Sequence, residues 1–283
     1  KNSWRWASGM PEGPEIRRAA DRVQQQIGGR VIDEAWFAFP ELASQADSFT
    51  GVQVSRVETR GKAMLIRFAD ERVLYSHNQL YGVWKLHSED KPPDTKRTLR
   101  VRLTAEGRCA SLYSASDISL WHCDNLAEHP FLARLGPDLL SQDVTPTDVL
   151  QRLNLKQFHR RSLGALLLDQ GLVAGLGNYL RSEILFFTQL PASARPVDLT
   201  TNQQQLLAHF IIETTRQAYQ TAGVTNQEAW IEQAKAAGES RKQWRFAAFD
   251  RAGLECHRCG SVIERRMVGS RRLYYCPHCQ GSL

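Results

Sequence analysis

The chain has 283 residues, of which 42% are hydrophobic, and its 36 Lys and Arg against 30 Asp and Glu give a net charge of +6. This length and apolar fraction suit a globular protein of two modest domains and argue against intrinsic disorder. No stretch approaches the roughly 18 apolar residues of a membrane span, so no membrane association is expected. The positive balance favours a polyanionic partner without proving one.

The first ten residues show no consistent periodicity, end in a methionine and lack the apolar core of a secretory signal. We therefore expect residues 1–10 to be a leader or tag outside the fold, with the protein proper beginning at Pro11. Because no secretory signal is recognised, a cytoplasmic location is expected.

One amphipathic helix is predicted directly after Pro11. Apolar residues recur there at three-to-four spacing and stop at Gly28-Gly29, a typical glycine exit; they are Ile16, Ala19, Ala20, Val23 and Ile27. The pattern from Val31 to Cys123 then changes to short apolar runs separated by Gly, Asp and Pro, which predicts a β-sandwich. The strand candidates include Val52–Val57, Ala63–Phe68, Val73–Tyr75, Leu99–Leu103 and Ala110–Tyr113.

Helical spacing returns in the second half of the chain. The predicted segments are Val149–Leu153, Leu163–Gln170, Gly177–Phe187 and Gln203–Tyr219, followed by a compact cysteine-containing tail. We therefore expect an α+β protein with an N-terminal β-sandwich domain over residues 11–125, a helical domain over 126–250 and a terminal zinc finger over 251–283.

The strongest local motif is a pair of C-x-x-C turns, Cys256/Cys259 and Cys276/Cys279, sixteen residues apart. Two such turns supply the four thiolates that a tetrahedral Zn²⁺ site prefers, and a disulfide framework is unexpected in a cytoplasmic chain. The spacing predicts one structural zinc ion. Four arginines between the cysteine pairs belong to an expected β-hairpin that either reaches phosphates or is a solvated basic face; they are Arg265, Arg266, Arg271 and Arg272.

The segment Pro11-Glu12-Gly13-Pro14-Glu15 is the second motif. A proline with a free amine is a secondary amine with a pKa of about 8, substantially unprotonated at neutral pH. Its attack on a sugar C1′ gives an iminium directly, so base loss and strand elimination can share one covalent species. Glu12 could supply the proton if enclosure raises its pKa. Without other support, the same segment is simply a helix entry.

Five motifs in order resemble the formamidopyrimidine-DNA glycosylase and endonuclease VIII family, and most closely its bacterial endonuclease VIII branch. They are Pro11-Glu-Gly-Pro-Glu15, Arg60-Gly-Lys62, Tyr75-Ser-His-Asn-Gln-Leu-Tyr-Gly82, Leu167-Leu-Asp-Gln170 through Gly175-Leu-Gly-Asn178, and the four-cysteine finger. The resemblance runs from Pro11 to Gln280. It implies a helix–two-turn–helix in the helical domain and a bifunctional glycosylase and abasic-site lyase of base excision repair.

The resemblance also implies roles for particular side chains. Pro11 would be the Schiff-base nucleophile, Glu12 the general acid and Glu15 a helper that organises the pocket. Lys62 would assist β-elimination, although an ordinary exposed hairpin lysine is the alternative. Glu183 falls where the family places an acid that supports the site, and a solvent-facing helix acid is equally compatible with the sequence.

Several residues are expected to contact DNA. Arg271 matches the finger arginine that grips phosphates beside the lesion and acts in δ-elimination, and Arg134 matches another DNA contact. Asn178 would hold a phosphate at a helix N-terminus, unless Gly175–Asn178 is only a turn between helices.

A damaged nucleotide must leave the base stack before a glycosylase can reach its C1′, and a wedge must fill the vacancy. Gln79, Leu80 and Tyr81 combine a hydrogen-bonding side chain, apolar bulk and a stacking ring, which suits an insertion loop. The alternative is a strand whose apolar residues face the core.

Leu80 stands where the purine-specific branch has a methionine, and the later loop reads Ser114-Ala-Ser-Asp117 in place of that branch's Arg and Phe. These departures favour oxidised pyrimidines as substrates. Damaged double-stranded DNA is the expected partner, and we expect a monomeric bacterial protein that is associated with the nucleoid through DNA. Two alternatives remain: a purine-specific glycosylase and a non-catalytic zinc-finger DNA-binding protein. The nitrogen of Pro11 is an amide while Met10 precedes it. We therefore expect activity only after Met10 and the residues before it have been removed.

Overall fold

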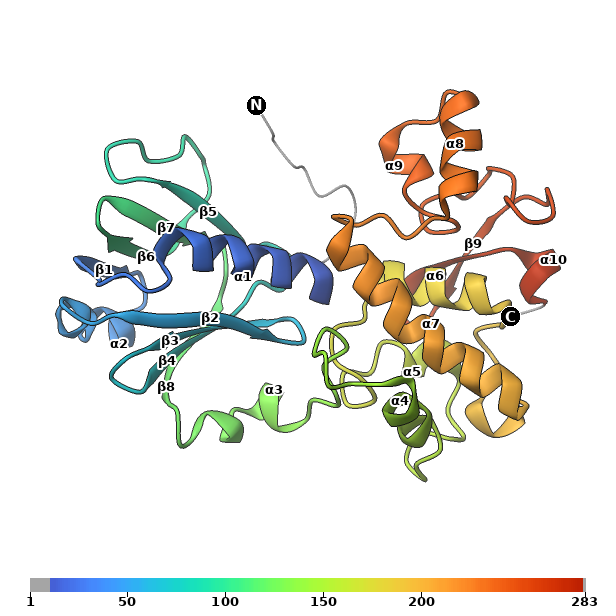
Figure 1. The fold of residues 1–283 in the computed structure, drawn as a ribbon, viewed down its shortest axis with the longest axis horizontal. Helices are drawn as coiled ribbons and strands as arrows, with labels where there is room; N and C mark the ends of the chain where they lie inside the picture. The colour runs from blue at the N-terminus through green and yellow to red at the C-terminus, as the bar shows by residue number, and fades with distance from the viewer. Residues whose placement is uncertain (1–10, 282–283) are drawn as a thin grey trace. The chain divides into compact units, whose positions relative to one another are not determined.

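The computed structural model describes residues 11–281 (Figure 1). The predicted leader, residues 1–10, lies outside the described residues. The chain divides into two compact units, one from Glu15 to Arg134 and one that joins the segment ending at Pro14 to the residues from Leu135 onward. No described helix combines the length and the apolar composition that a membrane crossing requires.

The unit Glu15–Arg134 contains two four-stranded antiparallel sheets, which confirms the predicted β-sandwich. One sheet has the strand order β1-β6-β7-β5 and the other β2-β3-β4-β8. The strands are β1 Glu34–Phe37, β2 Val54–Arg60, β3 Ala63–Phe68, β4 Arg72–His77, β5 Val83–Ser88, β6 Leu99–Ala105, β7 Arg108–Tyr113 and β8 Asp117–His122. The expected strand at Val52–Val57 is displaced, because Val52 and Gln53 form only loop bonds and an isolated bridge before β2 begins.

Helix α1, Gly13–Ile27, confirms the predicted amphipathic helix. Its apolar face, which includes Ile16 and Val23, is buried in one core together with residues from both sheets. Polar side chains of α1 also bind both sheets: Gln26 donates to the carbonyl oxygens of His87 in β5 and Cys109 in β7, and Gln24 accepts from the backbone N–H of Val57 in β2. The helix therefore fastens the two layers to each other.

Short helical segments complete this unit. They are α2 Pro40–Ala43, η1 Ala46–Phe49, η2 Leu126–Glu128 and α3 Pro130–Ala133. Both α2 and α3 begin with proline, whose fixed φ suits the first turn and whose missing N–H costs nothing there.

The second unit is built mainly from helices around one apolar core. Its elements are α4 Pro146–Leu153, α5 Leu163–Leu166, α6 Asn178–Thr188, η3 Pro196–Asp198, α7 Thr201–Gln220, α8 Glu228–Ala236, α9 Arg241–Trp244, β9 Glu264–Val268, β10 Arg271–Tyr275 and α10 Pro277–Gln280. Helix α6 packs against α7 and against the hairpin strand β10. Nine of its eleven residues are buried, so α6 is the central element of this unit.

The helix expected over Leu163–Gln170 is shorter in the structure, where α5 ends at Leu166. The chain turns after Leu167, and the side chain of Gln170 binds that turn instead of extending the helix. Its Oε1 accepts from the N–H of Gly175 at 3.0 Å and its Nε2 donates to the carbonyl of Leu176 at 2.8 Å. Gln170 thus braces the glycine-rich segment that leads into α6.

Candidate active site

Glu12 lies at the N-terminus of α6. It is 2% exposed, and its carboxylate accepts hydrogen bonds from the backbone N–H groups of Gly177, Tyr179 and Leu180 at 2.8, 2.7 and 3.3 Å. The first N–H groups of a helix have no partner within the helix, and the helix dipole is positive at this end. A side chain 165 residues away in sequence therefore caps α6.

Two glycine positions make this approach possible. A Cβ added at Gly177 would lie 2.5–2.7 Å from three side-chain atoms of Glu12, too close for any real contact. A Cβ at Gly13 would lie 2.9 Å from the Cα of Gly175, and the N–H of Gly13 donates to the carbonyl of Gly175 at 2.8 Å. Residues 12 and 13 are thus held against the turn before α6, which fixes the place of Pro11, the half-buried residue that precedes them.

Arg181 is a buried cation that sequence reasoning missed. It is 1% exposed and donates to the carbonyls of Gly164 and Val268 and to the side chain of Asn178. Burial, followed by the nearby Arg271, lowers its pKa to about 10 although Glu12 opposes the shift, so Arg181 stays charged at neutral pH. Its place three residues after Asn178, one helical turn along α6, was the available signal.

Asn178, the predicted phosphate contact, is the first residue of α6. Its side-chain amide donates to the carbonyl of Arg272 at 2.7 Å, and its side-chain oxygen accepts from Arg181 at 2.8 Å. The amide therefore links α6 to the hairpin, and one of its two N–H bonds is engaged within the protein. A role at a phosphate stays a prediction.

The hairpin predicted between the cysteine pairs is present as β9 and β10, in antiparallel register with Arg271 opposite Val268. Arg271 opens β10, and its guanidinium makes no hydrogen bond or ion pair with any residue between 11 and 281. Arg272 lies opposite Met267 and is exposed. These cations are available to an external anion, which suits the predicted phosphate contact of Arg271.

The four cysteines of the finger gather their sulfur atoms in one place. The Sγ atoms of Cys256 and Cys279 are 4.0 Å apart, those of Cys259 and Cys276 are 3.5 Å apart, and all four lie within 4.8 Å of one another. A tetrahedron with Zn–S bonds near 2.3 Å has edges of about 3.8 Å, so the set fits the ion. The zinc is structural, because four thiolates leave no position for water.

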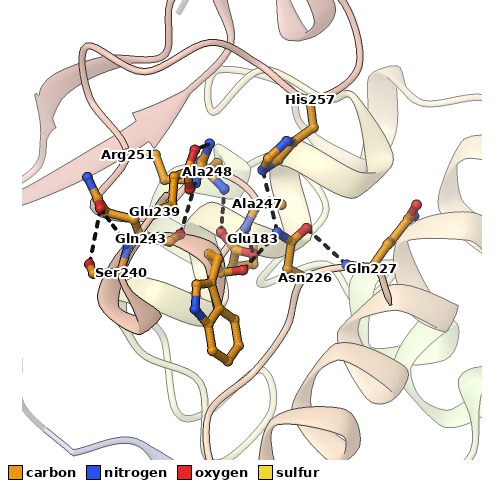
Figure 2. Close-up of polar contacts among 11 residues, drawn as sticks. Glu183, Asn226, Gln227, Glu239, Ser240, Gln243, Ala247, Ala248, Arg251 and His257 are labelled. Carbon is orange, nitrogen blue, oxygen red and sulfur yellow. Dashed lines mark hydrogen bonds and ion pairs between the residues drawn. The ribbon is translucent and has the colours of Figure 1, made fainter. Parts of the chain in front are cut away.

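Glu183 is wholly buried, so the solvent-facing alternative is wrong. Its carboxylate accepts from the backbone N–H groups of Ala247 and Ala248, each at 2.8 Å (Figure 2). It also accepts from the N–H of Phe249 at 2.8 Å and from the hydroxyl of Thr225 at 2.7 Å. Burial raises its pKa, and the four donors oppose that rise. Glu183 therefore anchors the segment before the finger to α6.

An ion pair between buried Arg251 and half-buried Glu239 holds the same segment, as Figure 2 also shows. Arg251, 1% exposed, donates to both carboxylate oxygens of Glu239 at 2.5 and 3.1 Å and to the carbonyl of Gln243 at 3.0 Å. Asn226 donates to the carbonyl of Trp244 from the other side. These polar contacts, together with helix α9 and the buried apolar side chains from Phe246 to Phe249, fix the chain between α8 and the finger.

In the unit Glu15–Arg134, Lys62 lies in the turn between β2 and β3, next to Gly61 with a φ of +56°. Lys62 is only 7% exposed, so the alternative of an ordinary exposed hairpin lysine is wrong. Its charge acts on His77, whose pKa is lowered by burial first and further by Lys62 and His129, against the opposing effect of Asp117. Lys62 is therefore held among titratable side chains.

His77 and His129 lead to a prediction about stability and pH. Burial lowers the pKa of both below the ordinary 6.5, so the unfolded chain takes up protons first as pH falls. Their stabilising contribution is complete above pH 6.5 and is lost below it. We expect the free energy of unfolding to decrease between pH 7.5 and 5.5 in urea titrations, with a smaller decrease in a His77→Gln variant. A free energy that is flat or rises over this window would contradict the assignment.

The predicted insertion residues lie in a turn, residues 78–82, between β4 and β5. Leu80 is 52% exposed and Tyr81 is 68% exposed, so the alternative of a core-facing strand is wrong. Gln79 is also exposed and has a φ of +49°. The turn thus presents two large apolar side chains and one amide to solvent.

Two predicted site residues remain, Glu15 and Arg134, and they differ in burial. Glu15, in the first turn of α1, is 7% exposed and engaged, which suits a structural helper. Arg134 follows α3, is exposed, and donates to the carbonyl of Pro130 at 3.0 Å. Contact with DNA stays a prediction for Arg134.

Family models cover both units. The formamidopyrimidine-DNA glycosylase N-terminal domain matches residues 10–116, the H2TH domain of the same enzyme matches 135–229, and a zinc finger found in FPG and IleRS matches 253–281. The chain belongs to the formamidopyrimidine-DNA glycosylase family. It is accordingly a DNA glycosylase and abasic-site lyase of base excision repair, as the resemblance implied, and the non-catalytic alternative is not supported.

Relatives within this family are similar over nearly the whole chain. The protein named Endonuclease 8 from Pectobacterium atrosepticum is 47% identical over 274 residues, and that from Salmonella arizonae is 45% identical over 271; each match covers 96% of this chain and 100% of the relative. Solved structures of Lactococcus lactis Fpg, one with DNA containing N7-benzyl-Fapy-dG and one with abasic-site DNA, have TM-scores of 0.80 and 0.79 at 21% and 22% identity. Both comparisons cover 96% of this chain and 100% of the other, and they establish the shared fold.

Proposed function

We propose that this enzyme removes oxidised pyrimidines from duplex DNA and then cuts the strand by β,δ-elimination, with the amine of Pro11 as covalent nucleophile. The proposal depends on one observation: three backbone N–H groups at the N-terminus of α6 donate to the carboxylate of Glu12 and hold it in place. Because Pro11 directly precedes Glu12, these hydrogen bonds also fix the position of the nucleophile. A nucleophile needs such a fixed position to gain from proximity.

The proposed chemistry begins with attack by the Pro11 nitrogen on C1′ of the flipped nucleotide. The N–C1′ bond forms, the glycosidic bond breaks, and the departing base takes its proton by way of Glu12. Opening of the sugar gives an iminium, in which the C1′=N⁺ bond acidifies the C2′ hydrogen. Loss of that proton expels the 3′ phosphate, a second elimination expels the 5′ phosphate, and water releases the amine.

Other residues take supporting parts in the proposal. Lys62 supplies a buried positive charge that assists the first elimination, and Arg271 holds the phosphates that leave. Asn178 and Arg134 contact the phosphate backbone, while Leu80 and Tyr81 fill the gap in the base stack. Glu15 and Glu183 act as positioning residues, since neither projects into solvent.

Two further elements belong to the proposal. Damaged double-stranded DNA is the partner of a monomeric enzyme located with the nucleoid in the bacterial cytoplasm. Activity requires the chain to begin at Pro11, with Met10 and the residues before it removed, because only then is the Pro11 nitrogen an amine.

The preference for pyrimidines rests on the short segment between β7 and β8, which offers Ser114, Ala115 and Ser116 and no large side chain. The test is cleavage of matched duplexes that carry thymine glycol or 8-oxoguanine. The proposal predicts faster cleavage of the thymine glycol duplex. Faster cleavage of the 8-oxoguanine duplex would instead assign the enzyme to the purine-specific branch.

A further inference from the structure

The insertion turn, residues 78–82, lies beside a second connection between the two sheets, residues 114–116. Strands β4 and β5 belong to different sheets, so residues 78–82 cross from one sheet to the other, and residues 114–116 cross back between β7 and β8. His77 pairs with Asp117 at one end of the crossings, and Val83 pairs with Tyr113 at the other. The two crossings therefore lie side by side.

Hydrogen bonds hold the insertion turn in one conformation. The N–H of Gly82 donates to the carbonyl of Asn78 at 2.8 Å, and a Cβ at Gly82 would lie 2.7 Å from the Cα of Asn78. The N–H of Gln79 donates to Nδ1 of His77 at 3.0 Å, which requires the neutral ring. Arg97 donates to the carbonyl of Tyr81 at 2.7 Å. The backbone that carries the wedge is thus preformed.

Ser116 provides the contact that bears on specificity. Its hydroxyl donates to the side-chain oxygen of Gln79 at 3.0 Å. Ser116 is itself fixed, because Ala115 before it is buried in the sandwich core and Asp117 after it opens β8. The side-chain nitrogen of Gln79 has no hydrogen bond with a residue of the described part of the chain. One end of this amide is held by the protein and the other is free.

We infer that Ser116 is a specificity-determining positioning residue, which holds the Gln79 carbonyl so that the amide NH₂ group donates to the base opposite the lesion. This inference rests on the proposed function, since it takes residues 79–81 as the wedge. Both side chains are exposed, so water weakens their bond in the free protein. Bound DNA would exclude that water and strengthen the bond. The favoured partner is a base edge that offers an acceptor, such as N1 of adenine.

The test measures binding rather than catalysis, so failure of the proposed chemistry would not affect it. Duplexes carry an uncleavable tetrahydrofuran site opposite either adenine or 1-deazaadenine, in which a C–H group replaces the N1 acceptor. We expect Kd to be about fivefold higher with 1-deazaadenine, the ratio that one hydrogen bond of about 1 kcal/mol gives. In Ser116→Ala the ratio should fall towards one, and in Ser116→Thr it should return.

Ser114→Ala is the matched control, since this serine lies in the same crossing and its hydroxyl has no partner within residues 11–281. It should keep the fivefold ratio. A merely structural role of Ser116 would raise both Kd values equally and leave the ratio intact. The inference is overturned if the unmodified protein shows no discrimination, if Ser116→Ala retains it, or if Ser114→Ala loses it to the same extent.

Discussion

Substitution of Gly177 by alanine is expected to lower the rate of base removal at least about 100-fold, the lower end of what a general acid contributes. The new Cβ would occupy the space of the Glu12 carboxyl group, 2.5 Å from its carbon. The backbone at Gly177, with φ −144° and ψ −154°, accepts alanine without strain. The effect therefore comes from displacement of Glu12. It is measured as the single-turnover rate of base release from a thymine glycol duplex.

A double variant separates this cause from general damage to α6. When Glu12 is first shortened to alanine, the space beside residue 177 opens. Glu12→Ala/Gly177→Ala should then be no slower than Glu12→Ala alone, in the manner of a double-mutant cycle. If the two substitutions instead multiply their effects, Gly177 acts independently of Glu12, and the proposed role of the hydrogen bonds between Glu12 and α6 is wrong.

Replacement of Glu183 by alanine should lower the free energy of unfolding by about 4 kcal/mol. Three buried N–H groups and one hydroxyl lose their acceptor, and each unsatisfied donor costs about 1–3 kcal/mol, partly offset by the buried charge that disappears. Glu183→Gln keeps one acceptor oxygen and should lose about half as much. Urea unfolding of the intact protein measures both.

Glu232 provides the control for Glu183. It lies on the surface of α8 and pairs with Lys235 at 3.1 Å in an exposed ion pair. Its replacement by glutamine should change the free energy of unfolding by less than about 0.5 kcal/mol. Equal effects of the two glutamine variants would show that the contacts of Glu183 do not anchor the segment before the finger.

Local signals in the sequence predicted the parts of the structure that depend on near neighbours. The cysteine spacing predicted the zinc finger because each C-x-x-C turn presents both of its thiolates locally. The apolar period of Ile16, Val23 and Ile27 predicted α1 for the same reason. Strand β8 was not among the predicted strands, because the alternation of Ile118 and Leu120 with polar residues is only four residues long. Its half-buried side chains gain their places from pairing with β4.

The sequence supplied candidate residues for the site but not the contacts between them. The motifs marked Pro11, Glu12 and Asn178 as candidates, yet no local pattern reveals that Glu12 caps a helix 165 residues further along the chain. Likewise, the burial of Arg181 depends on carbonyl groups from α5 and from the β9–β10 hairpin. Contacts of this kind arise only when the fold is complete.

The most direct test of the account uses the protein that begins at Pro11, incubated with lesion duplex and borohydride, beside the same protein with its terminal amine acetylated. Reduction of the iminium should leave a stable protein–DNA adduct in the first sample only, and mass spectrometry should place the linkage on Pro11. A linkage on another residue, or equal trapping and cleavage by the acetylated protein, would contradict the account.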